Sequence, residues 1–309
     1  MGTDLLAESE DSGDDWGRHD FWVSFICQRV VGHRKGFVAV ITHQSFLDES
    51  GTHDNSPLTI VGGYLFDAES ARRFQQEWSQ VLLPFRERGI TWFHACGCAH
   101  QEKNFAKLNY AERLSLFRKL VDLTRETAHI GFFTELESAV YDAWRANNPT
   151  VNSLVGSKYA ACCFQCPLFL RQILREEKDI GDIHYFFERI GEEKNGKGNP
   201  LDRERNELLA IIEATPSLTE AFRYGSETRA PKGQFHPLEA ADSMVWTYSS
   251  IHGPLTDFTR VSRQVFAKGR LRHRYTTMTP SALTEIARLN NDYRIRENTY
   301  VGKVRIFQF

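Results

Sequence analysis

Short apolar runs and amphipathic stretches alternate along the chain from about residue 38 onward. Two runs rich in β-branched and aromatic residues, 38–47 and 58–65, flank a polar turn. Short apolar runs bounded by turn residues are typical of strands, so this pair predicts a β-hairpin or meander. The first run ends in Asp48-Glu49-Ser50, which puts two carboxylates at the tip of a strand that is expected to lie in the core. Carboxylates in such surroundings repel each other and lose water, so they tend to recruit a cation or a proton.

Apolar positions elsewhere in the chain recur at helical or strand spacing. Asp67 is expected to cap one helix that Gly89 ends, and Asn109 is expected to open a second helix. Pro167 is expected to kink or split a third helix, because proline lacks a backbone N–H. The predicted strands are 90–94, 129–136, 183–187 and 221–224, and the predicted helices are 67–88, the stretch from Asn109, 151–177, 201–214 and the stretch from Pro237.

This alternation of strands and helices, without an internal repeat, predicts one elaborated α/β domain over residues 37–254. Its sheet is expected to be mixed and flanked by helices, with the 38–47 strand central and the 183–187 strand beside it. The leader, residues 1–36, carries seven acids against one base in its first 20 positions and is expected to be largely disordered. The tail, residues 255–309, is expected to be a helical and basic extension packed on the same domain.

Composition narrows the class of protein. With 38 basic and 40 acidic residues the net charge is −2, so any binding of nucleic acid depends on a local basic patch. The N-terminus does not resemble a secretory signal, and no apolar run approaches membrane-spanning length. Six cysteines are scattered along the chain, and we expect them to stay reduced. The expected localisation is therefore cytoplasmic, with no membrane contact.

Three predicted elements carry acids at comparable places. Asp48 ends the first strand, Glu188 ends the 183–187 strand, and Asp242 follows two alanines in a late helix. Small residues before Asp242 would let that helix approach a sheet closely. Such a set of oxygen ligands suits Mg²⁺ or Mn²⁺, and a pair of ions can activate water for phosphodiester cleavage. Each acid taken singly is equally a turn residue or a helix cap, and spacing alone does not bring the three together.

Five segments carry a resemblance to a known family: FLDESGTH, VGGYLF, WFHA, FFERIG and PLEAAD. They are similar to the family catalogued as domain of unknown function 3800, which is marked by an Asp-Glu-Ser motif and a Gln-x-x-Asp motif. Asp48-Glu49-Ser50 matches the first mark, and Asp242 matches the aspartate of the second. Glu239 stands where the family has glutamine. The resemblance covers residues 37 to about 250.

The resemblance implies a ribonuclease-H-like fold with helical insertions and a metal-dependent nuclease centre. Asp48, Glu188 and Asp242 would hold Mg²⁺ or Mn²⁺, with Glu49 as a further catalytic acid. The implied reaction is phosphodiester hydrolysis of DNA or RNA by metal-activated water, in phage defence or a mobile element. Residues expected to contact substrate or to support the metal ligands are Ser50, His94, Lys158, Arg189 and Glu239. The alternative is a non-catalytic scaffold that binds nucleic acid or a protein partner, with a homodimer as one arrangement.

Two other stretches invite a functional interpretation. The ligand types in HACGCAH, residues 94–100, suit zinc. If that stretch is extended, alternate residues lie about 6.6 Å apart, so at most two of the four ligands share an ion. Cys162 and Cys166 are candidates to complete such a site, although buried reduced cysteines usually act as small hydrophobes. The basic run 268–274 is the strongest local patch for nucleic acid, with a solvated surface beside the acidic leader as the alternative.

Overall fold

The computed structural model describes residues 41–53, 55–176, 181–189, 199–231, 233–250, 255–266 and 271–306. The chain divides into two units, Met1–Ile41 and Thr42–Phe309, and the elements below belong to the second unit apart from the first residue of its first strand. The predicted leader at 1–36 lies outside the described residues. So do the loop residues 190–198 after Glu188 and the first part of the basic run, residues 267–270.

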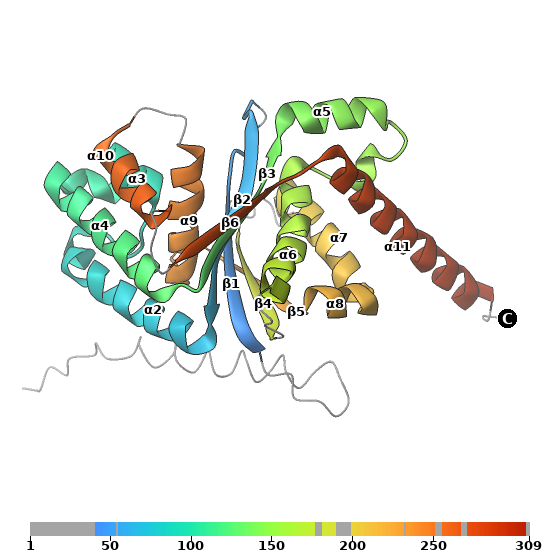
Figure 1. Cartoon of the computed structure of the whole chain (residues 1–309), viewed down its shortest axis with the longest axis horizontal. Helices are drawn as coiled ribbons and strands as arrows, with labels where there is room; N and C mark the ends of the chain where they lie inside the picture. Colours follow the sequence, from blue (N-terminus) through green and yellow to red (C-terminus); the bar gives the residue numbers. More distant parts are fainter. Residues whose placement is uncertain are drawn as a thin grey trace, which may run out of the picture. The chain divides into compact units, whose positions relative to one another are not determined.

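One mixed sheet organises the described chain, with strand order β5-β4-β1-β2-β3-β6 (Figure 1). Its strands are β1 (Ile41–Ser50), β2 (Leu58–Asp67), β3 (Ile130–Glu137), β4 (Asp182–Glu188), β5 (Tyr224–Ala230) and β6 (Arg272–Thr277). Strand β2 is antiparallel to β1 and to β3, whereas β6 is parallel to β3 and β5 is parallel to β4. The prediction of a mixed sheet with the first strand central and the 183–187 strand beside it is confirmed.

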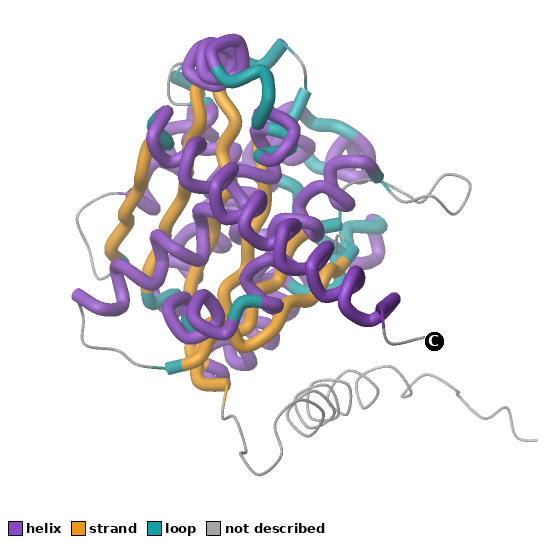
Figure 2. Tube along the Cα trace, turned by 90° about the vertical axis from the view of Figure 1, so that its right-hand side faces the viewer, coloured by secondary structure: helices purple, strands orange, loops and turns teal. Residues whose placement is uncertain are grey.

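Helices cover both faces of this sheet (Figures 1 and 2). One face, called here the α9 face, carries α2 (Ala68–Leu82), α3 (Ala95–His100), α4 (Tyr110–Thr127), α9 (His236–Ser249) and α10 (Asp257–Ser262). The other, the α6 face, carries α5 (Ser138–Asn147), α6 (Lys158–Glu176), α7 (Pro200–Ala214), α8 (Pro216–Phe222) and α11 (Pro280–Ile306). The described residues also include the short 3-10 helices Leu83–Arg88, Lys103–Lys107, Asn152–Leu154 and Arg263–Phe266.

The predicted helix starts rest on side-chain caps that the sequence makes visible. The Asp67 carboxylate accepts a hydrogen bond from the Ser70 amide at 2.7 Å, which opens α2. Asn109 and Glu112 form a capping box at the start of α4. Gly89 ends the 83–88 turn in a left-handed conformation, φ 83°, that residues with a Cβ rarely adopt. These local signals are why the helix boundaries on this face were predictable.

Close packing of α9 on the sheet depends on small residues, as predicted from the alanines before Asp242. A Cβ placed on Gly63 of β2 would lie 1.7 Å from the Phe46 carbonyl oxygen and 3.0 Å from the Ala241 Cβ. Only glycine at position 63 therefore leaves room for α9 to cross the centre of the sheet. This contact fixes the distance between Asp242 and the strands.

Three predicted elements differ in the structure. Residues 90–94 form no strand, because the Phe93 amide donates to a side chain, Glu239, at 2.8 Å instead of to a neighbouring strand. Helix α6 begins at Lys158 and continues through Pro167 without splitting, since packing on β2 and β3 overrides the local preference. The strand expected at 221–224 is β5, shifted towards the C-terminus by the short helix α8.

The C-terminal tail also takes a role that its pattern did not predict. Residues 272–277 form strand β6, which extends the sheet beside β3, and helix α11 follows it. Part of the basic run is thus an edge strand of the sheet and not a helical extension.

Candidate acidic site

Two of the predicted acids end neighbouring strands and face the same side. Leu47 and Phe187 belong to the core of the α6 face. Because successive side chains of a strand point to opposite faces, Asp48 and Glu188 point towards the α9 face. The rings two residues before them, Phe46 and Phe186, stack with their centroids 4.5 Å apart and an interplanar angle of 10°. Each acid therefore lies two residues along its strand from one shared aromatic contact.

The third acid, Asp242, approaches this face from helix α9. Its Oδ2 accepts a hydrogen bond from the Ala95 amide at 2.7 Å, so the carboxylate caps the short helix α3. His94, at the start of α3, has its Nε2 3.9 Å from Asp242 Oδ1. His94 Nδ1 accepts from the Gly97 amide, which leaves Nε2 as the protonated nitrogen facing the carboxylate. Asp242 and His94 thus lie beside each other on the α9 face.

All three carboxylates are buried, with exposed fractions of 3% for Asp48, 5% for Glu188 and 8% for Asp242. The Glu49 amide donates to Asp48 Oδ1 at 2.8 Å. Opposite Asp48 in the ladder stands Gly62, which contributes no side chain on that face. Burial of carboxylates on one face of a sheet is costly without compensating partners or a cation.

Carboxylate oxygens are the ligand type that Mg²⁺ and Mn²⁺ prefer, so the donor chemistry of these acids fits such an ion. Within the described part of the chain, however, no three His, Cys, Asp or Glu side chains lie close enough together to hold a metal ion. The structure therefore places Asp48, Glu188 and Asp242 on one face without assembling them into a ligand cluster.

The argument against a zinc site in residues 94–100 assumed an extended stretch, and this geometry was wrong. Residues 95–100 form helix α3, and His94 caps it. Cys98 is buried and Cys96 is half-buried. Cys162 and Cys166 lie on the other face of the sheet, where they contact the Thr59 and Val61 carbonyls. The two pairs of cysteines are thus separated by the sheet.

Glu239, which stands at the glutamine position of the resemblance, has a structural role. One of its oxygens accepts from the Trp78 indole N–H at 2.7 Å and from the Phe93 amide at 2.8 Å. Its other oxygen lies 2.8 Å from His236 Nδ1, and His236 Nε2 lies 2.8 Å from the Ser79 hydroxyl. The carboxylate ties α9 to α2 and to the segment before α3.

The series Ser79–His236–Glu239 has the order of groups found in hydrolytic triads. Ser79 lies inside helix α2, where backbone N–H groups bond within the helix. A serine nucleophile needs free N–H donors beside it to stabilise the developing oxyanion. We therefore interpret this series as a structural link between helices.

The remaining predicted residues are distributed over both faces. Glu49 points to the α6 face, where its charge adds to the effect of burial in raising the pKa of Tyr159. Lys158 donates to the Ser138 hydroxyl at 2.6 Å, on the same side of the sheet. Arg189 is exposed just after β4, and its amide donates to the Ala230 carbonyl. Ser50 is half-buried and, by alternation, points to the same face as Asp48.

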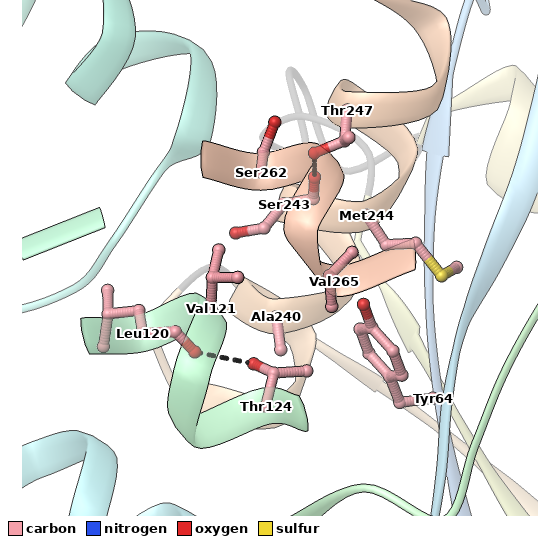
Figure 3. A pocket seen from close by; sticks show the side chains of 10 residues that line it. All are labelled: Tyr64, Leu120, Val121, Thr124, Ala240, Ser243, Met244, Thr247, Ser262 and Val265. Carbon is pink, nitrogen blue, oxygen red and sulfur yellow. Dashed lines mark hydrogen bonds between the residues drawn. The ribbon is translucent and has the colours of Figure 1, made fainter. Parts of the chain in front are cut away.

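A small pocket beside α9 lies apart from these acids (Figure 3). It is lined by Tyr64, by side chains of α4 and α9, and by Ser262 and Val265, none of them a candidate acid. Thr124 and Thr247 direct their hydroxyls to the Leu120 and Ser243 carbonyls of their own helices. Burial raises the pKa of Tyr64, so its phenol stays neutral. The serine and threonine hydroxyls of the lining are thus already engaged, which favours a packing gap over a ligand site.

No protein-family model, no curated protein and no solved structure matches this chain. Among the described helices, none is both long and apolar enough to cross a membrane.

Proposed function

We propose that this protein is a metal-dependent nuclease of ribonuclease-H-like architecture, in the family resembled by its Asp-Glu-Ser motif. One observation carries the proposal: three buried carboxylates reach the α9 face from β1, β4 and α9. The central position of β1, with β4 beside it, is the arrangement expected from the alternation of strands and helices along the chain.

Asp48, Glu188 and Asp242 would hold Mg²⁺ or Mn²⁺, which supplies activated water and stabilises the leaving oxygen. The protein's own contribution is to bury these carboxylates on one face of a sheet. His94, whose side chain is 24% exposed beside Asp242, is placed to contact a substrate phosphate. Binding of the ion requires the three carboxylates to approach one another, because they form no ready cluster.

The test combines cleavage with thermal stability. We expect Mn²⁺ or Mg²⁺ to raise the melting temperature, since a ligand that binds only the folded state stabilises it. Asp48→Asn keeps the shape of the side chain and removes one of the like charges. We expect it to abolish cleavage of DNA or RNA and to weaken the metal response, while the metal-free variant stays folded or gains slightly in stability.

Glu49→Gln is the matched control, because the adjacent carboxylate points to the opposite face. This variant is expected to keep both cleavage and the metal response. An equal metal response in the wild type and in Asp48→Asn, or unfolding of Asp48→Asn, contradicts the anchoring role of Asp48.

A non-catalytic scaffold remains the second candidate because two of the acids already have structural partners. Glu239 accepts three hydrogen bonds, and Asp242 caps α3. A scaffold predicts nucleic-acid or protein binding that does not depend on divalent ions, and no cleavage of single- or double-stranded DNA or RNA.

A further inference from the structure

A buried guanidinium lies directly behind the end of strand β4. The side chain of Arg205, in α7, is 0% exposed and covers the ring of Phe187, with 5.0 Å from the guanidinium carbon to the ring centroid. Phe187 belongs to the core of the α6 face, so Arg205 lies on that face. The next residue of the strand, Glu188, points to the α9 face, where the acidic site lies. Arg205 and the Glu188 carboxylate are therefore on opposite sides of one strand end.

Arg205 reaches this strand end at its backbone. Its Nη1 donates to the Glu188 carbonyl oxygen at 3.4 Å. The Arg189 amide donates to the Ala230 carbonyl of β5 at 2.9 Å. This carbonyl and this amide belong to the same peptide group, which is planar and rigid. The peptide group that follows Glu188 is thus held at both ends, by Arg205 at its C=O and by β5 at its N–H.

Tyr159, in α6, holds the guanidinium in this position. Its hydroxyl accepts from Arg205 Nη1 at 2.7 Å, and its ring centroid lies 5.9 Å from the guanidinium carbon. Burial and, after it, the neighbouring groups of Cys163 and Glu49 raise the pKa of Tyr159 well above its usual value, so the phenol stays neutral. Glu49 follows Asp48 in β1. Tyr159 therefore interacts with the end of β1 and, through Arg205, with the end of β4.

The buried ion pair of Arg205 is not explained by stability alone. Its partner is the Asp202 carboxylate, 3.0 Å away and 9% exposed. Replacing a buried ion pair by apolar residues of similar volume is often neutral or stabilising, so such a pair is weak evidence for a stabilising role. The bond to the Glu188 peptide gives the pair a geometric role instead.

We propose that Arg205, supported by Tyr159, is a positioning residue for the acidic site. By holding the peptide group after Glu188, it sets the direction in which the Glu188 carboxylate leaves the strand. This inference rests on the proposed function, because the positioned group is one of the three acids. Loss of a residue that orients a metal ligand typically lowers metal affinity or activity by about 10–100-fold. Arg205 acts in this way through a backbone carbonyl, from the opposite face of the sheet.

A double variant separates positioning from stability. Asp202→Leu with Arg205→Met replaces the buried pair by apolar side chains, so the fold is kept while the bond to the Glu188 peptide is lost. We expect this variant to bind Mn²⁺ about 10–100-fold more weakly than the wild type, measured from the electron paramagnetic resonance signal of free Mn²⁺.

The matched control is a second ion pair of the same helix. Arg203 and Glu207 are 3.9 Å apart, and their side chains are 67% and 59% exposed. Arg203→Gln with Glu207→Gln removes this pair without touching β4. The control should keep the Mn²⁺ affinity of the wild type.

Hydrogen exchange in EDTA tests the bond to the strand end without metal. In the double variant of Asp202 and Arg205, the Arg189 amide should exchange about fivefold faster or more, because one hydrogen bond that opposes local opening is lost. The amides of β2 serve as the internal reference for the stability of the whole sheet. Tyr159→Phe removes only a hydroxyl, so we expect it to fold and to show smaller changes of the same sign in both measurements.

The outcomes distinguish this inference from the proposed function. Unchanged Mn²⁺ affinity in the folded double variant overturns the positioning role and leaves the nuclease. So does exchange that rises equally at Arg189 and in β2, because the whole sheet is then less stable. If the double variant does not fold, unchanged Mn²⁺ affinity in Tyr159→Phe overturns the role. Absence of Mn²⁺ binding and of cleavage in the wild type overturns the nuclease, and the positioning role with it.

Discussion

The two faces of the sheet treat polar groups in different ways. On the α6 face, apolar side chains of the four strands β4, β1, β2 and β3 meet α6 and α7, and the thiols of Cys162, Cys163 and Cys166 are fully buried among them. On the α9 face, large aromatic rings alternate with buried titratable groups: Asp48, Glu188, Glu239, Asp242, His184 and His236. His184, for example, lies between the hydroxyls of Ser226 and Thr228.

This difference means that one face mainly stabilises the fold, whereas the other holds the groups that can take part in chemistry. A continuous apolar layer contributes free energy of folding in proportion to the area that it buries. Buried carboxylates and imidazoles subtract from that free energy unless each finds a partner. The α6 face therefore supports the sheet, and the α9 face holds the groups from which a site can be built.

The largest effect on the free energy of unfolding is expected at the buried ion pair of Arg205 and Asp202 on the α6 face. Arg205 is fully buried, lies 3.0 Å from Asp202, donates to the Tyr159 hydroxyl at 2.7 Å and covers the ring of Phe187. Arg205→Ala leaves the Asp202 carboxylate buried without its cation, so urea denaturation should show a loss of about 3–5 kcal/mol.

Arg203→Ala, in the same helix, is the control. Its guanidinium is 67% exposed and 3.9 Å from Glu207, so the expected change is about 0.5 kcal/mol or less. Replacing Asp202 and Arg205 together by apolar residues should recover part of the loss. Equal effects of the two single variants would show that the buried pair does not stabilise the α6 face.

The next effect distinguishes structural from functional acids on the α9 face. Glu239→Leu removes the acceptor for the Trp78 indole and the Phe93 amide, both buried, and should cost about 2–4 kcal/mol in urea denaturation. Glu239→Gln, the residue expected from the resemblance, keeps one oxygen for both donors and offers an N–H₂ to His236. We expect it to stay within about 1 kcal/mol of the wild type.

A comparable loss in Glu239→Gln would mean that the network needs the negative charge. Cleavage that vanishes in a stable Glu239→Gln would instead move Glu239 into the catalytic set.

A smaller, pH-dependent effect on the free energy of unfolding is expected at His273, where β6 packs on the α9 face. His273 packs between Tyr64 and Phe266, and burial lowers its pKa to about 4. In the unfolded chain a histidine binds its proton near pH 6.5. Between pH 6.5 and 4 the unfolded state therefore holds more protons, and stability falls as the pH falls, by about 1–3 kcal/mol.

His273→Phe should flatten the dependence of the unfolding free energy on pH within this window, while leaving it unchanged above pH 7. If the wild type and the variant lose stability in parallel from pH 6.5 to 4, the ring of His273 is not the group that titrates.

The smallest effect concerns reactivity and not stability. Burial raises the pKa of Cys162 and Cys163, and raises that of Cys166 to about 12, so these thiols hold their protons and are closed to reagents. Cys96, at the start of α3 beside the acidic site, is half-buried. In a Cys27→Ser background, native labelling with a thiol reagent should modify Cys96 first and leave the α6-face thiols unmodified until urea unfolds the chain. If Cys166 in the native protein is labelled as fast as Cys96, the thiols of the α6 face are not closed to reagents.

Local signals made much of this architecture predictable. The apolar runs 38–47 and 58–65, separated by turn residues, predicted β1 and β2, and the apolar run 183–187 predicted β4 with Glu188 at its end. Asp67 and Asn109 marked helix starts, because a cap depends only on a side chain and the amides two or three residues later. Acids at the ends of two predicted strands, and the small residues before Asp242, suggested the three carboxylates, but spacing alone did not bring them together.

Tertiary structure alone decided three features: the role of Glu239, the helical form of residues 95–100 and the strand in the basic tail. Glu239 binds the Phe93 amide and the Trp78 indole, both far away along the chain, and this contact replaces the strand predicted at 90–94. Strand β6 joins the sheet only through its pairing with β3, which lies far earlier in the chain. A sequence pattern records which face a residue prefers within a few neighbours. Which distant segments pack against that face depends on the packing of the whole sheet and its helices. The free energy of this packing is shared among residues that no local pattern connects.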